Sequence, residues 1–429
     1  MKNLNIKIDN VTRVEGHGNI VLDVKDGQLL DARFDVVESP RFFEVMLQGR
    51  RYTDASWIAS RICGICAVTH TSASIRATED AFGLVPSGQT VALRKLIFHG
   101  EVMQSHILHL YFLMAPDFFG AGSVISLAGT HGEVVKRALR MKGLANDICA
   151  VVGGRHVHPV TMAVNGFTCV PEEARLRELM RHLVEARSDM NDTIELFKGF
   201  VFPDFTRETE YVSLKGVEEY PFYSGDMTSS DGYDIKPRDY KDRIVETVVP
   251  TSTAKRASAN RGSYMVGALA RFNNNHGLLH PGAREAAKAL GLTAPCHNPY
   301  MINLAQVVET VHCMEDAINI IDGLLTKGIR RESADSVPRE GRGVGIVEAP
   351  RGALIHDYTY DSDGKIKDAN CIMPTGQNIG NLEEDMRAMM PRIMDMPEDE
   401  ITGRLKMLVR AYDPCISCST HEIEIIINR

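Results

Sequence analysis

The chain opens with apolar and polar residues in alternation. Leu4, Ile6 and Ile8 alternate with polar residues, and a second alternating run ends at Val24 before a polar turn. Successive side chains of a β-strand point to opposite faces, so this pattern is typical of a sheet with one buried face. We therefore expect a small β-rich edge over residues 1–36.

Helical periodicity follows over residues 57–200, most clearly after Pro171. The apolar residues that fall on one face there are Leu176, Leu179, Met180, Leu183, Met190, Ile194 and Phe197. They predict one long amphipathic helix with an acidic first turn. A second apolar stripe predicts another long helix over residues 300–327, and core packing is its simplest role.

The remaining segments mix strand and turn signals. Residues 202–262 are rich in Tyr, Pro, Asp, Gly and Ser without a sustained period, which indicates an irregular or β-containing excursion. Residues 341–429 should hold β segments, with strands and tight turns over 341–378, and a last helix over 399–412. No linker divides the sequence, so we predict one domain over residues 1–429, mainly α with peripheral β (α+β), around a central bundle of long helices.

Composition excludes several classes of protein. Hydrophobic residues make up 44% and charged residues 24% of the chain, which is typical of a globular protein. The formal net charge of -8 lacks the basic surface of a nucleic-acid binder, so no nucleic-acid partner is expected. No apolar run reaches about 18 residues and the N-terminus does not read as a signal peptide, so we expect a cytoplasmic chain without a membrane span.

The nine cysteines favour thiols or metal ligands over a disulfide framework, because their number is odd and no secretion signal is apparent. We expect four of them to be buried hydrophobic residues, the commoner role for an isolated cysteine. These four are Cys149, Cys169, Cys296 and Cys313.

Two C-x-x-C pairs lie near opposite ends of the chain: Cys63 with Cys66, and Cys415 with Cys418. Two residues between cysteines let both sulfurs face one metal ion, so two such pairs complete a tetrahedral site. Four thiolates select soft or borderline metals, namely zinc, iron in clusters, copper(I) or nickel.

A structural zinc site is the simplest interpretation, but zinc ribbons usually close short loops in small folds that need the metal to form. A chain of this length does not need such support. Four charged residues also stand in motifs where burial would make charge costly: Arg13, Glu15, Glu44 and Arg351. Together these features favour a buried functional metal site over a zinc scaffold.

The two cysteine motifs read R-I-C-G-I-C-A-V-T-H over residues 61–70 and D-P-C-I-S-C-S-T-H over residues 413–421. As a pair they resemble the signatures of the large subunit of nickel-iron hydrogenases. The resemblance continues through R-V-E-G-H, G-G-R-H-V-H-P, A-P-R-G and P-T-G-Q-N, so it spans essentially the whole chain. It implies the reversible heterolytic cleavage of hydrogen into protons and electrons at a metal site held by the helix bundle.

The resemblance also implies a role for each cysteine of the two pairs. Cys63 and Cys415 should be terminal thiolates on nickel, while Cys66 and Cys418 should bridge nickel to an iron that carries carbon monoxide and cyanide. Cys415 should accept the proton first, and Glu15 should pass it outward. Arg351 should lie over the open face of the metals as a fixed cation.

A magnesium ion is implied beside this site, with Glu44, the backbone carbonyl of Cys371 and His421 as its protein ligands. Carboxylate and carbonyl oxygens suit this hard ion, whereas His421 rests on the resemblance alone. Four further residues are expected around the metals without binding them. They are His70, Pro350, Thr375 and Asp413.

Two features depart from the pattern of many relatives. Ser105 stands where an aspartate is common near the active-site arginine, which is similar to the soluble cytoplasmic branch of the family. That branch serves NAD(P), a deazaflavin, viologen or sulfur acceptors. The tail over residues 422–429 is usually removed after nickel insertion, and its β-prone sequence could instead pair with an N-terminal strand.

No cysteine-rich cluster motif is present beyond the two pairs, so no iron-sulfur cluster is expected in this chain. The resemblance implies an iron-sulfur small subunit as a partner and a further diaphorase-like or ferredoxin-like electron-transfer subunit. Two alternatives remain, namely the metal-free quinone-site relative in NADH-quinone reductase and the zinc scaffold. The four paired cysteines argue against the first, and Glu15 and Arg351 would have no task in the second.

Overall fold

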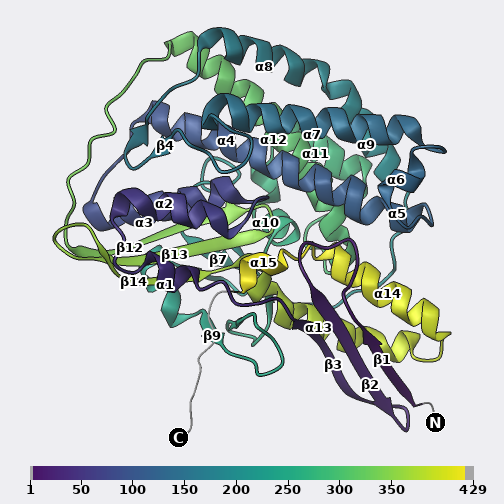
Figure 1. The fold of residues 1–429 in the computed structure, drawn as a ribbon. Coiled ribbons are helices and arrows are strands. Elements are labelled where there is room, and N and C mark those ends of the chain that lie inside the picture. Colours follow the sequence, from purple (N-terminus) through teal and green to yellow (C-terminus); the bar gives the residue numbers. More distant parts are fainter. Residues whose placement is uncertain (1–2, 421–429) are drawn as a thin grey trace, which may run out of the picture.

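The computed structural model describes residues 3–420, which begin with a three-stranded antiparallel sheet (Figure 1). Its strands are β1 (Leu4–Ile8), β2 (Gly18–Lys25) and β3 (Gln28–Val36), in the order β1-β2-β3. Buried and more exposed positions alternate along β1 and β2, and the apolar residues Leu4, Ile6 and Ile8 take the buried positions of β1, as the sequence predicts. The N-terminal sheet is thus confirmed, and its last strand packs against α13 (Pro374–Ile393).

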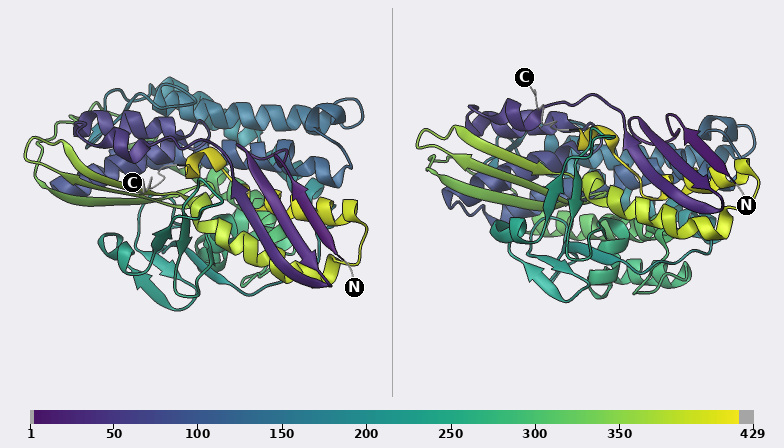
Figure 2. Two further views of the ribbon diagram at one scale, coloured as in Figure 1. Left: turned by 60° about the horizontal axis from the view of Figure 1, so that its bottom comes forward. Right: turned by 90° about the horizontal axis from the view of Figure 1, so that it is seen from below.

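Long helices form the centre of the molecule, as predicted (Figures 1 and 2). They include α3 (Ala67–Phe82), α4 (Gly88–Ile107), α7 (Gly132–Gly153) and α12 (Ile302–Lys327). Helix α4 packs against both α7 and α12. The expected helix over residues 300–327 is confirmed, and the central bundle with it.

The prediction of a single long helix after Pro171 is wrong, because the structure divides this segment into α8 (Glu173–Glu185) and α9 (Arg187–Lys198). Ala186 joins them with a φ of -70° and a ψ of -7°, which breaks the α-helical path. Both halves bury the predicted apolar stripe. The bend lets α8 pack on α7 and α12 while α9 reaches α11 (Pro281–Ala289), a tertiary preference that periodicity cannot show.

A second antiparallel sheet consists of β12 (Gly341–Ala349), β13 (Gly352–Tyr360) and β14 (Ile366–Ile372), as the sequence predicts. The expectation of strands and turns over residues 374–378 is wrong, because Pro374 is the first residue of α13. Proline suits a first helical position, since its φ is already helical and its missing N–H has no partner there.

The predicted β-containing excursion is confirmed by short strands. They are β6 (Glu210–Leu214), β7 (Met227–Ser229), β8 (Tyr233–Ile235), β9 (Val245–Thr247), β10 (Arg256–Ser258) and β11 (Tyr264–Met265). The expected last helix is α14 (Glu398–Ala411), followed by the short α15 (Ile416–Ser419). The remaining elements are α1 (Phe43–Leu47), α2 (Tyr52–Ala59), α5 (Ala115–Phe118), α6 (Val124–Leu127), α10 (Ala268–Asn275), β4 (Met162–Ala163) and β5 (Gly166–Phe167).

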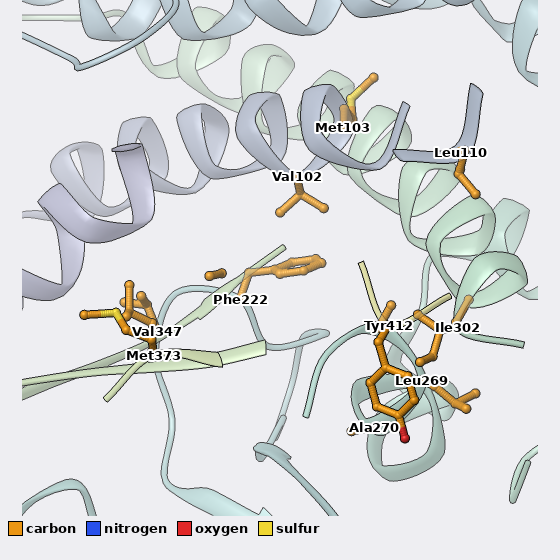
Figure 3. Packing of buried hydrophobic residues seen from close by; sticks show 14 of the residues in the cluster. Val102, Met103, Leu110, Phe222, Leu269, Ala270, Ile302, Val347, Met373 and Tyr412 are labelled. Atoms are coloured by element: carbon orange, nitrogen blue, oxygen red, sulfur yellow. The ribbon is translucent and has the colours of Figure 1, made fainter. Parts of the chain in front are cut away.

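The largest hydrophobic cluster takes residues from almost every part of the chain. Figure 3 shows Val102 of α4, Ile302 of α12, Val347 of β12 and Tyr412 near the C-terminal motif within this core. The two ends of the chain are therefore held by the same packed interior as the central helices. Within residues 3–420, no helix combines the length and apolar character needed to cross a membrane.

Helix α3, which follows the first cysteine pair, lies directly on the backbone of β12. A Cβ atom on Gly345 would stand 2.1 Å from the Ala73 carbonyl oxygen and 2.6 Å from the Ala77 nitrogen. Gly343 makes an equally close approach, 2.1 Å from the Ala77 carbonyl oxygen. Glycine at both positions is what lets the helix and the sheet meet at this distance.

Gly345→Ala should therefore push α3 away from β12 and lower the free energy of unfolding by about 3 kcal/mol. Gly323→Ala is the matched control, because a Cβ atom there meets no atom within 4 Å and Gly323 lies inside α12. That control should be neutral or stabilising by up to about 1 kcal/mol. Denaturant unfolding of both variants measures the difference, and equal effects would contradict the close packing.

The core also contains a histidine that is kept neutral. Burial lowers the pKa of His312 from 6.5 to about 3, and its Nδ1 accepts the backbone N–H of His280 at 3.0 Å. Below pH 6.5 the unfolded chain binds a proton at this position that the folded chain does not. Stability should therefore fall by about 2 kcal/mol as the pH is lowered from 7 to 5.

His312→Asn retains an acceptor for the His280 N–H but does not titrate in this range, so its stability should depend less on pH. Unfolding at pH 7 and pH 5 compares the variant with the wild type. The same loss of stability in both would show that His312 is not responsible.

Candidate metal centre

The two cysteine pairs, far apart in sequence, meet inside the molecule. Their Sγ atoms all lie within 4.8 Å of one another. Across the pairs, Cys63 and Cys415 are 3.4 Å apart and Cys66 and Cys418 are 3.5 Å apart, while Cys415 and Cys418 are 2.7 Å apart. The structure thus brings together the four thiols that the sequence singled out.

Short local turns present these sulfurs. Cys63 follows a single 3-10 turn over Ser60–Ile62, and Cys66 immediately precedes α3. Cys415 immediately precedes α15, which contains Cys418. The two sulfurs of each pair therefore come from one short turn of backbone and can face the same metal ion, as the two-residue spacing predicts.

The four thiols are at least 95% buried, which makes their charge costly without a counterion. Hydrogen bonds from Cys415, Cys418 and Cys66 hold the pKa of the Cys63 thiol well below its usual range. Burial raises the pKa of Cys418 well above its usual range. One thiolate is thus stabilised by its neighbours, whereas ionising all four requires a bound cation, as a metal site would supply.

Arg351 lies in the turn between β12 and β13, close to this group of thiols. Its Nε donates to the Asp413 carbonyl at 2.6 Å, its Nη2 to Asp413 Oδ1 at 2.8 Å, and its Nη1 to Ser105 Oγ at 3.2 Å. Burial alone would lower the pKa of this guanidinium, but Asp413 and the nearby thiolates hold it well above its usual range. Arg351 is therefore a permanent buried cation beside the cysteines, as expected.

Glu15 is joined to the second cysteine pair by backbone pairing. Glu15 and Cys415 form an isolated parallel β-bridge, and the Glu15 carbonyl accepts the Ile416 N–H at 3.0 Å. The Glu15 carboxylate accepts the Ser417 N–H at 3.0 Å. The half-buried Glu15 side chain thus lies at the cysteine loop.

Three of the four expected surrounding residues fix the backbone or side chains of the site. Thr375 Oγ1 accepts the Cys415 N–H at 2.9 Å. Asp413 has a φ of 49° and accepts a hydrogen bond from Gln306 Nε2 at 3.3 Å in addition to its ion pair. The Pro350 carbonyl, next to Arg351, accepts a hydrogen bond from Arg271 Nη2 at 2.9 Å.

His70, the fourth, lies one turn into α3 and is fully buried. Its Nδ1 lies 3.2 Å from Nε2 of His356, and the other ring nitrogen of His356, Nδ1, lies 2.6 Å from the Tyr358 hydroxyl. Burial lowers the pKa of His70 to about 4, so the ring is neutral at pH 7. A neutral His70 adds no positive charge near Cys63.

The residues expected to bind magnesium also come together, as far as the structure describes them. Glu44 Oε1 accepts the Cys371 N–H at 2.8 Å, and the Lys255 ammonium lies 3.2 Å from Glu44 Oε2. Glu246 Oε2 lies 3.5 Å from the same ammonium. Two carboxylates thus lie together here and offer the oxygen donors that a hard cation prefers. His421 and the tail over residues 422–429 lie outside the described residues.

A buried ion network behind Arg351 was missed by the sequence reasoning. Arg271 Nε and Nη2 bond to both oxygens of Glu309 at 2.6 and 2.7 Å, and Nη1 bonds to Glu348 at 2.8 Å. The same guanidinium donates to the carbonyls of Ala349 and Pro350, which precede Arg351. The available signal was Glu309, a charged residue in the part of α12 where Val307, Val308 and Val311 form the apolar stripe.

A second missed residue supports the first cysteine pair. The carboxylate of Glu101 on α4 accepts the N–H groups of Val68 and Thr69 at 2.5 and 2.9 Å, in the first turn of α3. Burial raises the pKa of Glu101 to about 8. No motif surrounds Glu101, so only the fold shows that it faces the helix start after Cys66.

The expectation that all four isolated cysteines are buried is wrong for two of them. Cys149 and Cys313 are buried, but Cys169 is exposed and Cys296 is partly exposed. Cys169 and Cys296 lie in loops outside the helices, where an apolar side chain need not face the core.

Comparisons with known proteins agree with this geometry. Residues 41–132 and 235–421 match the family described as Nickel-dependent hydrogenase, and residues 5–39 match the HoxL-like family. The alpha subunit of sulfhydrogenase 1 from Pyrococcus furiosus is 33% identical and aligns with 99% of this chain and 100% of its own length. The alpha subunit of sulfhydrogenase 2 from the same organism is 34% identical over 98% of this chain and 100% of its own length.

A solved structure has the same fold over almost the whole chain. The NAD+-reducing NiFe-hydrogenase in the H2-reduced state superposes with a TM-score of 0.86 at 26% identity, covering 97% of this chain and 99% of its own. The fold, the four-cysteine group and the family match agree with one another. The chain therefore belongs to the nickel-dependent hydrogenase family and is the catalytic large subunit of a nickel-iron hydrogenase.

Proposed function

We propose that the four cysteines hold a nickel-iron centre whose iron carries carbon monoxide and cyanide. All four would bind nickel, and Cys66 and Cys418 would bind iron as well. The observation that carries this proposal is the gathering of four buried thiols within 4.8 Å. When bound, the centre supplies the metals at which hydrogen is split heterolytically and reversibly into protons and electrons.

The residues around the thiols would then move the proton. Cys415 would accept it at Sγ, and Glu15 would carry it away by changing between carboxylate and acid. The backbone bridge between Glu15 and Cys415 supports this order, because it fixes the two residues side by side. The half-buried position of Glu15 gives its carboxyl group access toward the protein surface.

Arg351 would keep a fixed positive charge at the face of the centre. Asp413 orients the guanidinium through two bonds, and Ser105 takes a third N–H without adding a second negative charge. The arginine therefore offsets the negative charge of the thiolates and cyanides in a site from which water is largely excluded.

Magnesium would bind near Glu44, with the Cys371 carbonyl and His421 completing the protein ligands. The carboxylate oxygens of Glu44 and Glu246, which both lie within 3.5 Å of the Lys255 ammonium, supply oxygen donors of the kind that magnesium prefers. Magnesium would strengthen the attachment of α1 to β14, because Glu44 lies in α1 and Cys371 in β14.

Electrons from hydrogen need a path out of the buried centre. We propose an iron-sulfur small subunit as the direct acceptor, followed by a diaphorase-like or ferredoxin-like subunit, in an enzyme located in the cytoplasm. The relatives support this assembly, since they are named as subunits of sulfhydrogenases and of an NAD-reducing hydrogenase. The metal-free quinone-site alternative does not account for the four-thiol group.

Glu15→Gln tests the proton route. The amide keeps an oxygen to accept the Ser417 N–H but cannot carry a proton, so hydrogen-dependent dye reduction should fall by at least about 100-fold. Nickel content should remain that of the wild type. The exposed Glu133→Gln serves as the control and should retain full activity. Undiminished activity in Glu15→Gln would contradict the route.

Asp413→Asn tests the buried ion pair. It leaves the Arg351 guanidinium without its carboxylate, which should cost about 3–5 kcal/mol of stability and reduce activity. Asp189→Asn removes the carboxylate of the surface pair with Arg140, whose arginine is 54% exposed, and should cost no more than about 1 kcal/mol. Thermal unfolding and hydrogen oxidation measured on both variants compare the two pairs, and similar small effects would contradict the assigned role.

A further inference from the structure

The second cysteine loop is enclosed by side chains from the N-terminal part of the chain. Ser417 lies between Cys415 and Cys418, and each of its three polar groups bonds to such a side chain. Its N–H donates to Glu15 at 3.0 Å, and its hydroxyl donates to Glu38 Oε2 at 3.0 Å. Its carbonyl accepts a hydrogen bond from Arg41 Nη2 at 2.5 Å.

Arg41 also reaches the first cysteine pair. The same Nη2 donates to the carbonyl of Ile62, the residue before Cys63. A guanidinium nitrogen of this kind carries two hydrogens in a fixed plane, so one atom can serve two carbonyls at a set angle. Arg41 therefore joins two segments that are remote in sequence and lie directly beside the thiols.

Two of the three partners of Ser417, Arg41 and Glu38, are themselves held in place. The guanidinium carbon of Arg41 lies 5.0 Å from the centre of the Phe43 ring, and the Arg41 N–H donates to the Thr420 carbonyl at 2.9 Å. Glu38 Oε1 lies 2.8 Å from His17 Nδ1. The contacts thus involve both the side chain and the backbone of the segment around residue 41.

The cysteine turns need such support. The 3-10 turn before Cys63 and helix α15 contain only 3 and 4 residues, so neither is long enough to fix the position of a sulfur by itself. No disulfide links the two pairs, whose members are all free thiols. The distances of 3.4 and 3.5 Å across the pairs therefore depend on contacts between the two backbones.

We propose that Arg41 is the positioning residue that sets the placement of the two cysteine pairs relative to each other, with Glu38 fixing Ser417 in between. This inference rests on the proposed nickel-iron site, since the two pairs must act as one set of ligands for it. Arg41 does not touch the metals, and it acts through the carbonyls of Ile62 and Ser417. Positioning contacts of this kind typically change metal affinity by about 10–100-fold when they are removed.

Arg41→Lys is the informative substitution, made in the complete enzyme purified without oxygen. Lysine keeps the charge and most of the stem, but its ammonium lacks the planar pair of hydrogens that spans two carbonyls. We expect nickel per chain to fall severalfold. In the fraction that retains nickel, the carbon monoxide and cyanide bands in the infrared spectrum should shift or broaden.

Arg94→Lys is the matched control for the loss of a buried guanidinium. Arg94 bonds to Glu79, Tyr223 and the Ala163 carbonyl, none of which belongs to a cysteine loop. The Arg94→Lys variant should have a lower thermal midpoint of unfolding, but it should keep full nickel and unshifted carbon monoxide and cyanide bands.

The outcomes separate this inference from the nickel site itself. Full nickel and unchanged bands in Arg41→Lys would overturn the positioning role while leaving the nickel site intact. An equal loss of nickel in Arg94→Lys would also overturn it, because the effect would then follow general stability. A wild-type enzyme without nickel would overturn the site and this inference together.

Discussion

The structure depends on bringing two pairs of thiols from opposite ends of the chain into one dry space. Four buried thiols repel one another once they ionise, and burial already raises the pKa of Cys418 well above its usual range. The rest of the fold supplies what this arrangement needs. The N-terminal segment brackets the second pair, α3 is anchored on β12 behind the first, and Arg351 provides a buried positive charge.

Buried charge is the second feature of the site, and the two buried arginines there have carboxylate partners. Arg351 is paired with Asp413, and Arg271 is paired with Glu309 and Glu348 while it binds the two carbonyls before Arg351. Removing one partner of such a pair would leave an unpaired buried ion and would lower the stability by several kcal/mol. The turn that presents the active-site arginine is thus fixed by electrostatics as well as by the strands on either side.

Much of the centre could be predicted from the sequence because its chemistry is local. C-x-x-C spacing predicts the direction of two sulfurs within one turn, and the motifs around Glu15, Glu44 and Arg351 carry the family resemblance. Secondary structure was predictable where periodicity was strong, as in α12 and the N-terminal sheet. The break at Ala186 and the helix that begins at Pro374 were not, because they are decided by tertiary packing.

The supporting contacts could not be predicted for the same reason. Arg41 and Ser417 are separated by 376 residues, and Glu309 lies in a helix whose apolar stripe suggests core packing. Glu101 faces the start of α3 only because α3 and α4 pack together. Such residues carry no spacing signal, since their partners lie in segments that are distant in sequence.

The central claim is that the four thiols hold a nickel-iron centre with carbon monoxide and cyanide on iron. An infrared spectrum of the anaerobically purified enzyme tests it most directly, because proteins absorb almost nothing in the region where metal-bound triple bonds stretch. Such a centre should give infrared bands from both carbon monoxide and cyanide, together with nickel and iron in the same sample. Metal-loaded protein without these bands would contradict it and would indicate a scaffold that binds another thiolate-preferring ion such as zinc.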